Sequence, residues 1–182
     1  VGSFIAERLP SRLTSEEIVL TGKYKSSILY SPYGQAELEQ AKEMLASIGG
    51  QELIGRSYIS LSQGEKQLLL IARSLMEKPE LLILDEATSG LDLFARERLL
   101  EQIGKITQMD QAPTILYVTH HVEEITAAMD HVLLLKEGEI IAQGPKEDIF
   151  HKEIMDRFYP QPVELIELGE DRYFIKVENR SL

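Results

Sequence analysis

Two successive carboxylates, Asp85 and Glu86, close the apolar run LLILDEA at residues 81–87. At the end of a buried strand, one carboxylate is a suitable ligand for Mg²⁺, and its neighbour could orient an attacking water. A second apolar run, at residues 114–121, leads to His120, which can hydrogen-bond a phosphate oxygen. Alternatively, the two carboxylates only cap the next helix, and taken alone the pattern favours that interpretation.

The stretch LSQGEKQ, at residues 61–67, carries a second possible site. Ser62 and Glu65 have the spacing of a capping box, which predicts that a helix begins here. A glycine weakens a helix, so Gly64 needs another reason to be present. One reason is a tight turn, and the other is a phosphate that approaches bare backbone N–H groups.

Helices dominate the first part of the chain. A capping box from Thr14 to Glu17 predicts a short helix to about Leu20. A helical face ending at Gly49-Gly50 is formed by apolar residues at helical spacing, Leu38, Ala41, Leu45 and Ile48. A further helix, apolar almost all round, is expected over 64–77.

Strands alternate with helices after residue 78. The runs at 81–87 and 114–121 predict buried parallel strands, joined by an exposed amphipathic helix. A helix over 122–129 and a hairpin that turns at Glu137-Gly138 follow. Beyond these we expect a helix start at 145–150 and a terminal hairpin within 162–182. The order predicts an α/β fold with parallel strands and a separate helical lobe.

Composition excludes several classes of protein. The chain has 182 residues, 43% of them hydrophobic, and no apolar run approaches the roughly 20 residues of a membrane-spanning helix. It has no cysteine, which excludes a disulfide framework and a thiolate metal site and fits the cytoplasm. A net charge of −11 argues against a nucleic-acid partner, which requires a basic face.

The order and spacing of these motifs strongly resemble the ATP-binding subunits of ABC transporters. Residues 61–65 look like the signature motif of that family, and 81–86 look like its Walker B strand. Residues 89–92, SGLD, look like its D-loop, and His120 falls at its switch histidine. The resemblance implies a partial P-loop NTPase core of the ABC ATPase type and a subunit that hydrolyses ATP to power transport.

The resemblance also implies roles for individual residues. The signature residues would bind the γ-phosphate of ATP held by the opposite subunit of a dimer, namely Ser62, Gln63, Gly64 and Glu65. Asp85 would hold Mg²⁺, and Glu86 would be the general base for the attacking water. His120 would contact the γ-phosphate, and Asp92 would reach across the dimer. The partners would be a second ATP-binding subunit and a separate membrane permease, on the inner face of the membrane.

The resemblance implies that the chain is divided into four segments. Residues 1–10 would be a remnant of a core strand and of the Q-loop region, and 11–77 a helical subdomain with the signature. Residues 78–150 would be an α/β half-core with Walker B, D-loop and switch histidine. A C-terminal extension, expected to form a hairpin, would occupy 151–182.

The sequence departs from the family pattern in two main places. It contains no G-x-x-x-x-G-K-[ST] phosphate loop, since Gly22-Lys23 and Gly104-Lys105 lack the other required residues. We therefore expect an N-terminally shortened ATPase that binds ATP weakly on its own. Ile5 and Ala6 stand where the family has its Q-loop glutamine, and Glu65 replaces the usual signature glutamine, which places a negative charge near an anion site.

Two other hypotheses remain. A soluble ABC-type ATPase that acts on chromosomes or ribosomes would share the signature, but its long coiled coil requires sustained heptads, which are not present here. A non-catalytic binding module is compatible with the missing phosphate loop. Glu86 argues against that module, because a protein without hydrolysis needs no base at this position.

Overall fold

The computed structural model describes residues 13–25, 33–169 and 171–178. Within the chain, two compact units meet at the Val118–Thr119 bond, and each is described here by itself. Residues 1–10, the expected Q-loop remnant, lie outside the described residues. Among those that are described, no helix is both long enough and apolar enough to cross a membrane.

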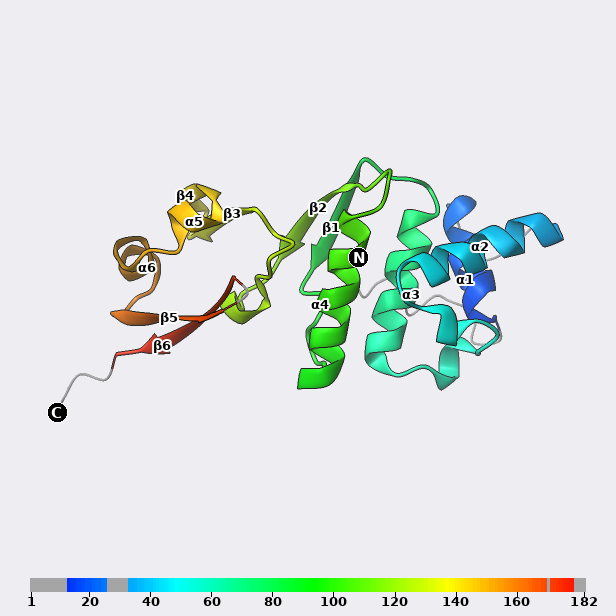
Figure 1. Cartoon of the computed structure of the whole chain (residues 1–182), viewed down its shortest axis with the longest axis horizontal. Coiled ribbons are helices and arrows are strands. Elements are labelled where there is room, and N and C mark those ends of the chain that lie inside the picture. The colour runs from blue at the N-terminus through cyan, green and yellow to red at the C-terminus, as the bar shows by residue number, and fades with distance from the viewer. Residues whose placement is uncertain (1–12, 26–32, 170, 179–182) are drawn as a thin grey trace. The chain divides into compact units, whose positions relative to one another are not determined.

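The first unit opens with helices. These are α1 (Ser15–Lys23), α2 (Gln35–Ser47) and α3 (Gln63–Leu75), with short 3₁₀ turns η2 (Gln51–Leu53) and η3 (Tyr58–Ser60) between α2 and α3. The predicted capping box at the start of α1 is present, because the Thr14 N–H donates to Glu17 Oε2 at 2.8 Å. Figure 1 shows α1, α2 and α3 packed together as a helical lobe.

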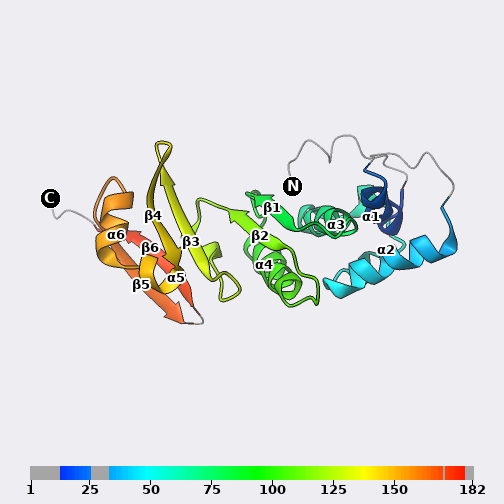
Figure 2. The same cartoon turned by 90° about the horizontal axis from the view of Figure 1, so that it is seen from above.

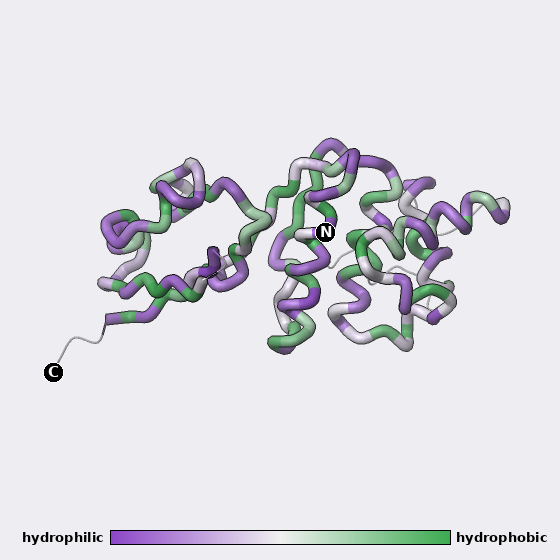
Figure 3. The backbone as a smooth tube through the Cα atoms, in the orientation of Figure 1, coloured by the Kyte–Doolittle hydropathy of each residue, from purple (hydrophilic) through white to green (hydrophobic). Residues whose placement is uncertain are grey.

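A β-α-β segment completes the first unit. Strand β1 (Leu81–Asp85), helix α4 (Leu93–Thr107) and strand β2 (Thr114–Val118) follow one another, and the two strands pair in parallel with Leu81 opposite Thr114. Figure 2 shows α4 along one side of the strands, and Figure 3 shows hydrophobic residues along both of them. The parallel pairing that the sequence predicted is confirmed.

One core joins the helical lobe to the β-α-β segment. It contains Ile18 of α1, Leu69 of α3, Leu84 of β1 and Ile106 of α4, all with no measurable exposure. The strands are not buried on both faces, however. Four of their apolar side chains are 41–53% exposed, namely Leu81, Ile83, Leu116 and Val118. The prediction of fully buried strands is therefore wrong for one face of the sheet.

The second unit is built from two antiparallel hairpins. After the 3₁₀ turn η4 (Val122–Glu124) come β3 (His131–Lys136), β4 (Glu139–Pro145), α5 (Lys146–Ile149), α6 (Lys152–Phe158), β5 (Val163–Gly169) and β6 (Arg172–Val177). Glu137 and Gly138 both have positive φ, as the predicted β3–β4 turn requires. The hairpins share a core that includes Leu134, Phe150, Met155 and Val163.

The predicted helix over 122–129 is wrong, because only the three residues of η4 are helical there. Two side chains instead bond the local backbone. Thr119 Oγ1 accepts a hydrogen bond from the His121 N–H at 3.0 Å, and Thr126 Oγ1 accepts one from the Ala128 N–H at 3.3 Å. Such bonds compete with helix formation.

Candidate functional site

The signature stretch lies at the start of α3. Ser62 is the N-cap, and its Oγ accepts a hydrogen bond from the Glu65 N–H at 3.3 Å. Glu65 Oε2 in turn accepts one from the Ser62 N–H at 2.7 Å, so the predicted capping box is confirmed. Ser62 and Gln63 are exposed, and the positive end of the helix dipole at this position favours an anion.

Gly64 lies close to the start of α4. A Cβ atom at this position would be 3.3 Å from the Cβ of Ala95 and 3.8 Å from Leu91 Cδ1. The backbone of Gly64 is helical, so the tight-turn explanation for this glycine is not what the structure shows. The starts of α3 and α4 therefore adjoin, and the signature and D-loop stretches lie side by side in the first unit.

Asp92 caps α4. Its Oδ1 accepts hydrogen bonds from the N–H groups of Phe94 at 2.9 Å and Ala95 at 3.1 Å. The capping interpretation considered for Asp85 and Glu86 is therefore wrong, since Asp92 is the N-cap of the next helix.

Asp85 and Glu86 are exposed at the carboxyl end of β1. The Glu86 N–H donates to the Val118 carbonyl at 2.9 Å, which ties the residue to the end of β2. Glu86 has φ of +46°. This left-handed conformation raises the free energy of any residue that carries a side chain. Strain of this kind concentrates at functional sites, and it lies here on the residue expected to be the base.

Mg²⁺ suits the donor set at the end of β1. The ion is commonly held by one or two carboxylates together with phosphate oxygens and waters. Asp85 supplies such a carboxylate at an exposed strand end. No group of three or more histidine or acidic side chains able to hold a metal occurs among the described residues.

His120 belongs to the second unit, whereas Asp85 and Glu86 belong to the first. The imidazole is exposed, with its ring centroid 4.0 Å from that of His121. Thr119 Oγ1 donates to Glu124 Oε2 at 2.6 Å, and Glu124 is only 2% exposed. Glu124 thus anchors the loop that carries His120. This role of Glu124 was not predicted from the sequence.

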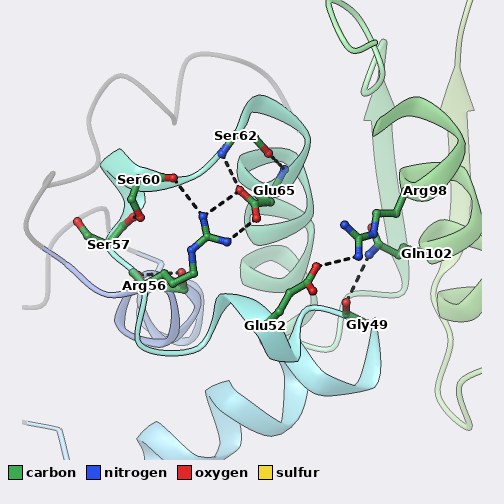
Figure 4. Close-up of polar contacts among 10 residues, drawn as sticks. Gly49, Glu52, Arg56, Ser57, Ser60, Ser62, Glu65, Arg98 and Gln102 are labelled. Atoms are coloured by element: carbon green, nitrogen blue, oxygen red, sulfur yellow. Dashed lines mark hydrogen bonds and ion pairs between the residues drawn. The ribbon is translucent and has the colours of Figure 1, made fainter. Parts of the chain in front are cut away.

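Arg56 is a second residue that sequence reasoning had missed. Figure 4 shows its guanidinium beside Glu65, with Nη1 donating to Oε1 and Nη2 donating to Oε2 at 3.3 Å. Partial burial raises the pKa of Glu65, but hydrogen bonds from Arg56 and Ser62 outweigh burial, and the pKa falls below its ordinary value. Glu65 is therefore an ionised group with a fixed counter-ion.

A shallow cavity of about 650 Å³ lies at the C-terminal ends of α3 and α4. Leu75 at the end of α3 and Gln108 just after α4 line it, together with Met44 and Met109. None of the candidate site residues borders it.

Comparison with known proteins identifies the family. The family model described as ABC transporter matches residues 4–89. An ABC transporter ATP-binding protein of Streptococcus mutans is 65% identical over 97% of this chain and 68% of its own length. An uncharacterized ABC transporter ATP-binding protein of Lactococcus lactis, YmeB, is 54% identical over 96% of this chain and 67% of its own length. The chain belongs to the family of ABC transporter ATP-binding proteins.

A solved structure agrees with this assignment. A metal-chelate type ABC transporter in an inward-facing conformation superposes with a TM-score of 0.76 at 25% identity, over 93% of this chain and 69% of that chain. The predicted α/β fold of the ABC ATPase type, with its helical lobe, is confirmed. This chain spans about two thirds of the length of the two bacterial relatives.

Proposed function

We propose that this chain supplies the signature, Walker B, D-loop and switch-histidine segments of an ATPase that powers a membrane transporter. The observation that carries the proposal is the side-by-side placement of the starts of α3 and α4, where Gly64 faces Ala95. This brings the signature and the D-loop to one surface. Asp85 and Glu86 lie at the end of β1, a position where α/β sheets bind their ligands.

In this proposal the exposed start of α3 binds a phosphate of ATP held by a second ATP-binding subunit. Ser62 Oγ donates to a phosphate oxygen, and the N–H groups of Gln63 and Gly64 add to the positive end of the helix. Glu65 holds the Ser62 backbone in place, as it does in the capping box. The absence of a side chain at Gly64 lets α3 pack closely against Ala95 at the start of α4.

Four other residues have proposed roles of their own. Asp85 would hold Mg²⁺, which when bound would offset phosphate charge. Glu86 accepts a proton from the attacking water, and His120 donates a hydrogen bond to the γ-phosphate. Asp92, beyond capping α4, contacts the second subunit. Phosphoryl transfer depends mainly on positioning and charge, so division of the site between subunits couples hydrolysis to their closure.

The proposal includes a separate permease chain in the membrane, with this subunit on its cytoplasmic face. The superposition on a metal-chelate type transporter supports a metal chelate as the first class of cargo to test. The 182-residue chain alone is expected to hydrolyse ATP poorly, because its sequence contains no phosphate loop. A soluble ATPase without a permease is the alternative, and co-purification with a membrane protein from native cells separates the two.

Ser62→Ala tests the shared site in the native full-length protein. We expect loss of ATP hydrolysis by the dimer, because the phosphate loses a donor from the opposite subunit, while the ATP affinity of the monomer stays unchanged. Steady-state hydrolysis and equilibrium ATP binding measure the two effects.

Thr14→Ala is the control, because Thr14 is the N-cap of α1 and its N–H donates to Glu17 Oε2 as the Ser62 N–H donates to Glu65 Oε2. Loss of either cap costs about 1 kcal/mol of stability. Only the Ser62 variant should lose hydrolysis. Equal loss of monomer affinity and hydrolysis in Ser62→Ala would contradict a site shared between subunits.

A further inference from the structure

Arg56 connects the starts of two helices. Its backbone carbonyl accepts hydrogen bonds from the Ser15 N–H at 2.9 Å and from Ser15 Oγ at 3.1 Å, at the start of α1. Ser15 is fully buried, so this end of Arg56 is firmly held. The guanidinium reaches in the other direction, to Glu65 near the start of α3.

The guanidinium makes three contacts around the signature (Figure 4). It binds both carboxylate oxygens of Glu65, and Nη2 also donates to the Ser60 carbonyl at 3.1 Å. A planar fork on a carboxylate restrains orientation as well as distance. Arg56 therefore holds the chain just before the signature and the first turn of α3 in one arrangement.

Glu65 presents two problems to a phosphate site, and Arg56 addresses both. The carboxylate is a negative charge within the first turn of the helix that would receive the anion, and the guanidinium offsets it. The carboxylate must also keep its bond to the Ser62 N–H, at 2.7 Å, for the capping box to persist. In the described part of the chain, Ser62 Oγ accepts one bond and donates none, so its proton remains available for a phosphate oxygen.

We propose that Arg56 is a positioning residue for the signature site: it neutralises Glu65 and fixes the carboxylate so that Ser62 and the first N–H groups of α3 face the phosphate. The inference rests on the proposed function of the signature. It assigns Arg56 no contact with ATP, since it acts through Glu65 and the Ser60 carbonyl.

Arg56→Ala in the native full-length ATPase tests the proposal. Removal of the guanidinium leaves Glu65 as an unpaired charge beside the expected phosphate, and we expect hydrolysis to fall by about tenfold or more, as is typical when a charged hydrogen bond is lost. ATP affinity of the monomer should not change. Because Coulomb repulsion is screened by salt, part of the loss should recover at high ionic strength.

Glu65→Gln separates positioning from a merely structural role. Glutamine keeps an acceptor for the Ser62 N–H but carries no charge, so Arg56→Ala should have a much smaller effect on hydrolysis in the Glu65→Gln background. Additive losses in the double variant, or full activity of Arg56→Ala alone, would overturn the proposal. A purely structural role predicts the same thermal destabilisation in both backgrounds and no recovery with salt.

Arg98→Ala is the matched control, because Arg98 pairs with Glu52 at 3.0 Å on the same unit and both side chains are well exposed. Its loss should leave hydrolysis unchanged. Ser62→Ala serves as the second reference. If Ser62→Ala leaves the dimer active, the proposed function itself fails; if it abolishes hydrolysis while Arg56 and Glu65 show no coupling, only the inference about Arg56 fails.

Discussion

Glu86 shows how a single residue combines strain and chemistry. Its left-handed backbone follows directly from its place between the end of β1 and the turn toward α4, where the Ser89 N–H donates to its carbonyl at 3.0 Å. Glycine would adopt this conformation without cost. Glu137 in the β3–β4 turn has a similar φ of +54°, so the expected role of Glu86 rests on its place at the end of β1 rather than on strain.

We expect Glu86→Gly to maintain or raise the free energy of unfolding, by up to about 1 kcal/mol, because the strain is relieved. The same variant should abolish hydrolysis, because it removes the general base. Glu137→Gly is the matched control, since Glu137 has φ of +54° in the β3–β4 turn. Glu137→Gly should likewise maintain or raise the free energy of unfolding, and it should hydrolyse ATP at the full rate. Chemical denaturation and ATPase assays test both, and a marked destabilisation by Glu86→Gly would contradict the strain argument.

At the scale of elements, close packing in the helical lobe depends on a missing side chain. Where α1 passes α3, a Cβ on Gly22 would lie 2.0 Å from the backbone carbonyl oxygen of Arg73. The Arg73 Nε–H also donates to Thr21 Oγ1 at 2.8 Å across the same contact. Backbone atoms cannot move aside as a flexible side chain would, so the two helices can approach this closely only at a glycine.

Gly22→Ala should therefore force α1 away from α3 and lower the free energy of unfolding by about 1–3 kcal/mol or more. Gly34→Ala is the control, because no atom lies within 4 Å of a Cβ built there. As an N-cap change it should cost less than about 1 kcal/mol. Urea denaturation measures both, and equal stability of the two variants would show that the helices separate without cost.

The sequence predicted those elements whose signals are local. Capping boxes located the starts of α1 and α3, and the turn residues Glu137 and Gly138 located the β3–β4 hairpin. Family resemblance located the candidate site. The sequence did not reveal Arg56 as the partner of Glu65, because the pair spans a loop and no helical or strand period connects residues nine positions apart. The helix expected at 122–129 failed because local side-chain bonds, such as that of Thr126, replaced helical ones.

At the scale of the whole molecule, the chain divides into two units with separate cores. The division falls after β2, so the elements before it and the elements after it pack around different sets of buried residues. Leu69 is fully buried in the first core and Met155 in the second. Segments 11–77, 78–150 and 151–182 remain predictions for the domains.

A core truncation in each unit tests this independence. Met155→Ala should cost about 2–5 kcal/mol and should speed hydrogen exchange in β3–β6 while amides of α3 and β1 remain protected. Leu69→Ala should produce the opposite pattern. Hydrogen exchange measured by mass spectrometry distinguishes the two. Loss of protection throughout the chain in either variant would show that the units unfold as one.

The exposed side of the β1–β2 pair has a consequence for the biosynthesis of this protein. In the described part of the chain each strand pairs only with the other, which leaves open edges beside four exposed apolar side chains, namely Leu81, Ile83, Leu116 and Val118. Such edges recruit other unfolded chains. We therefore expect the β1–β2 pair to be prone to association with other chains during biosynthesis until its edges and its exposed face are covered.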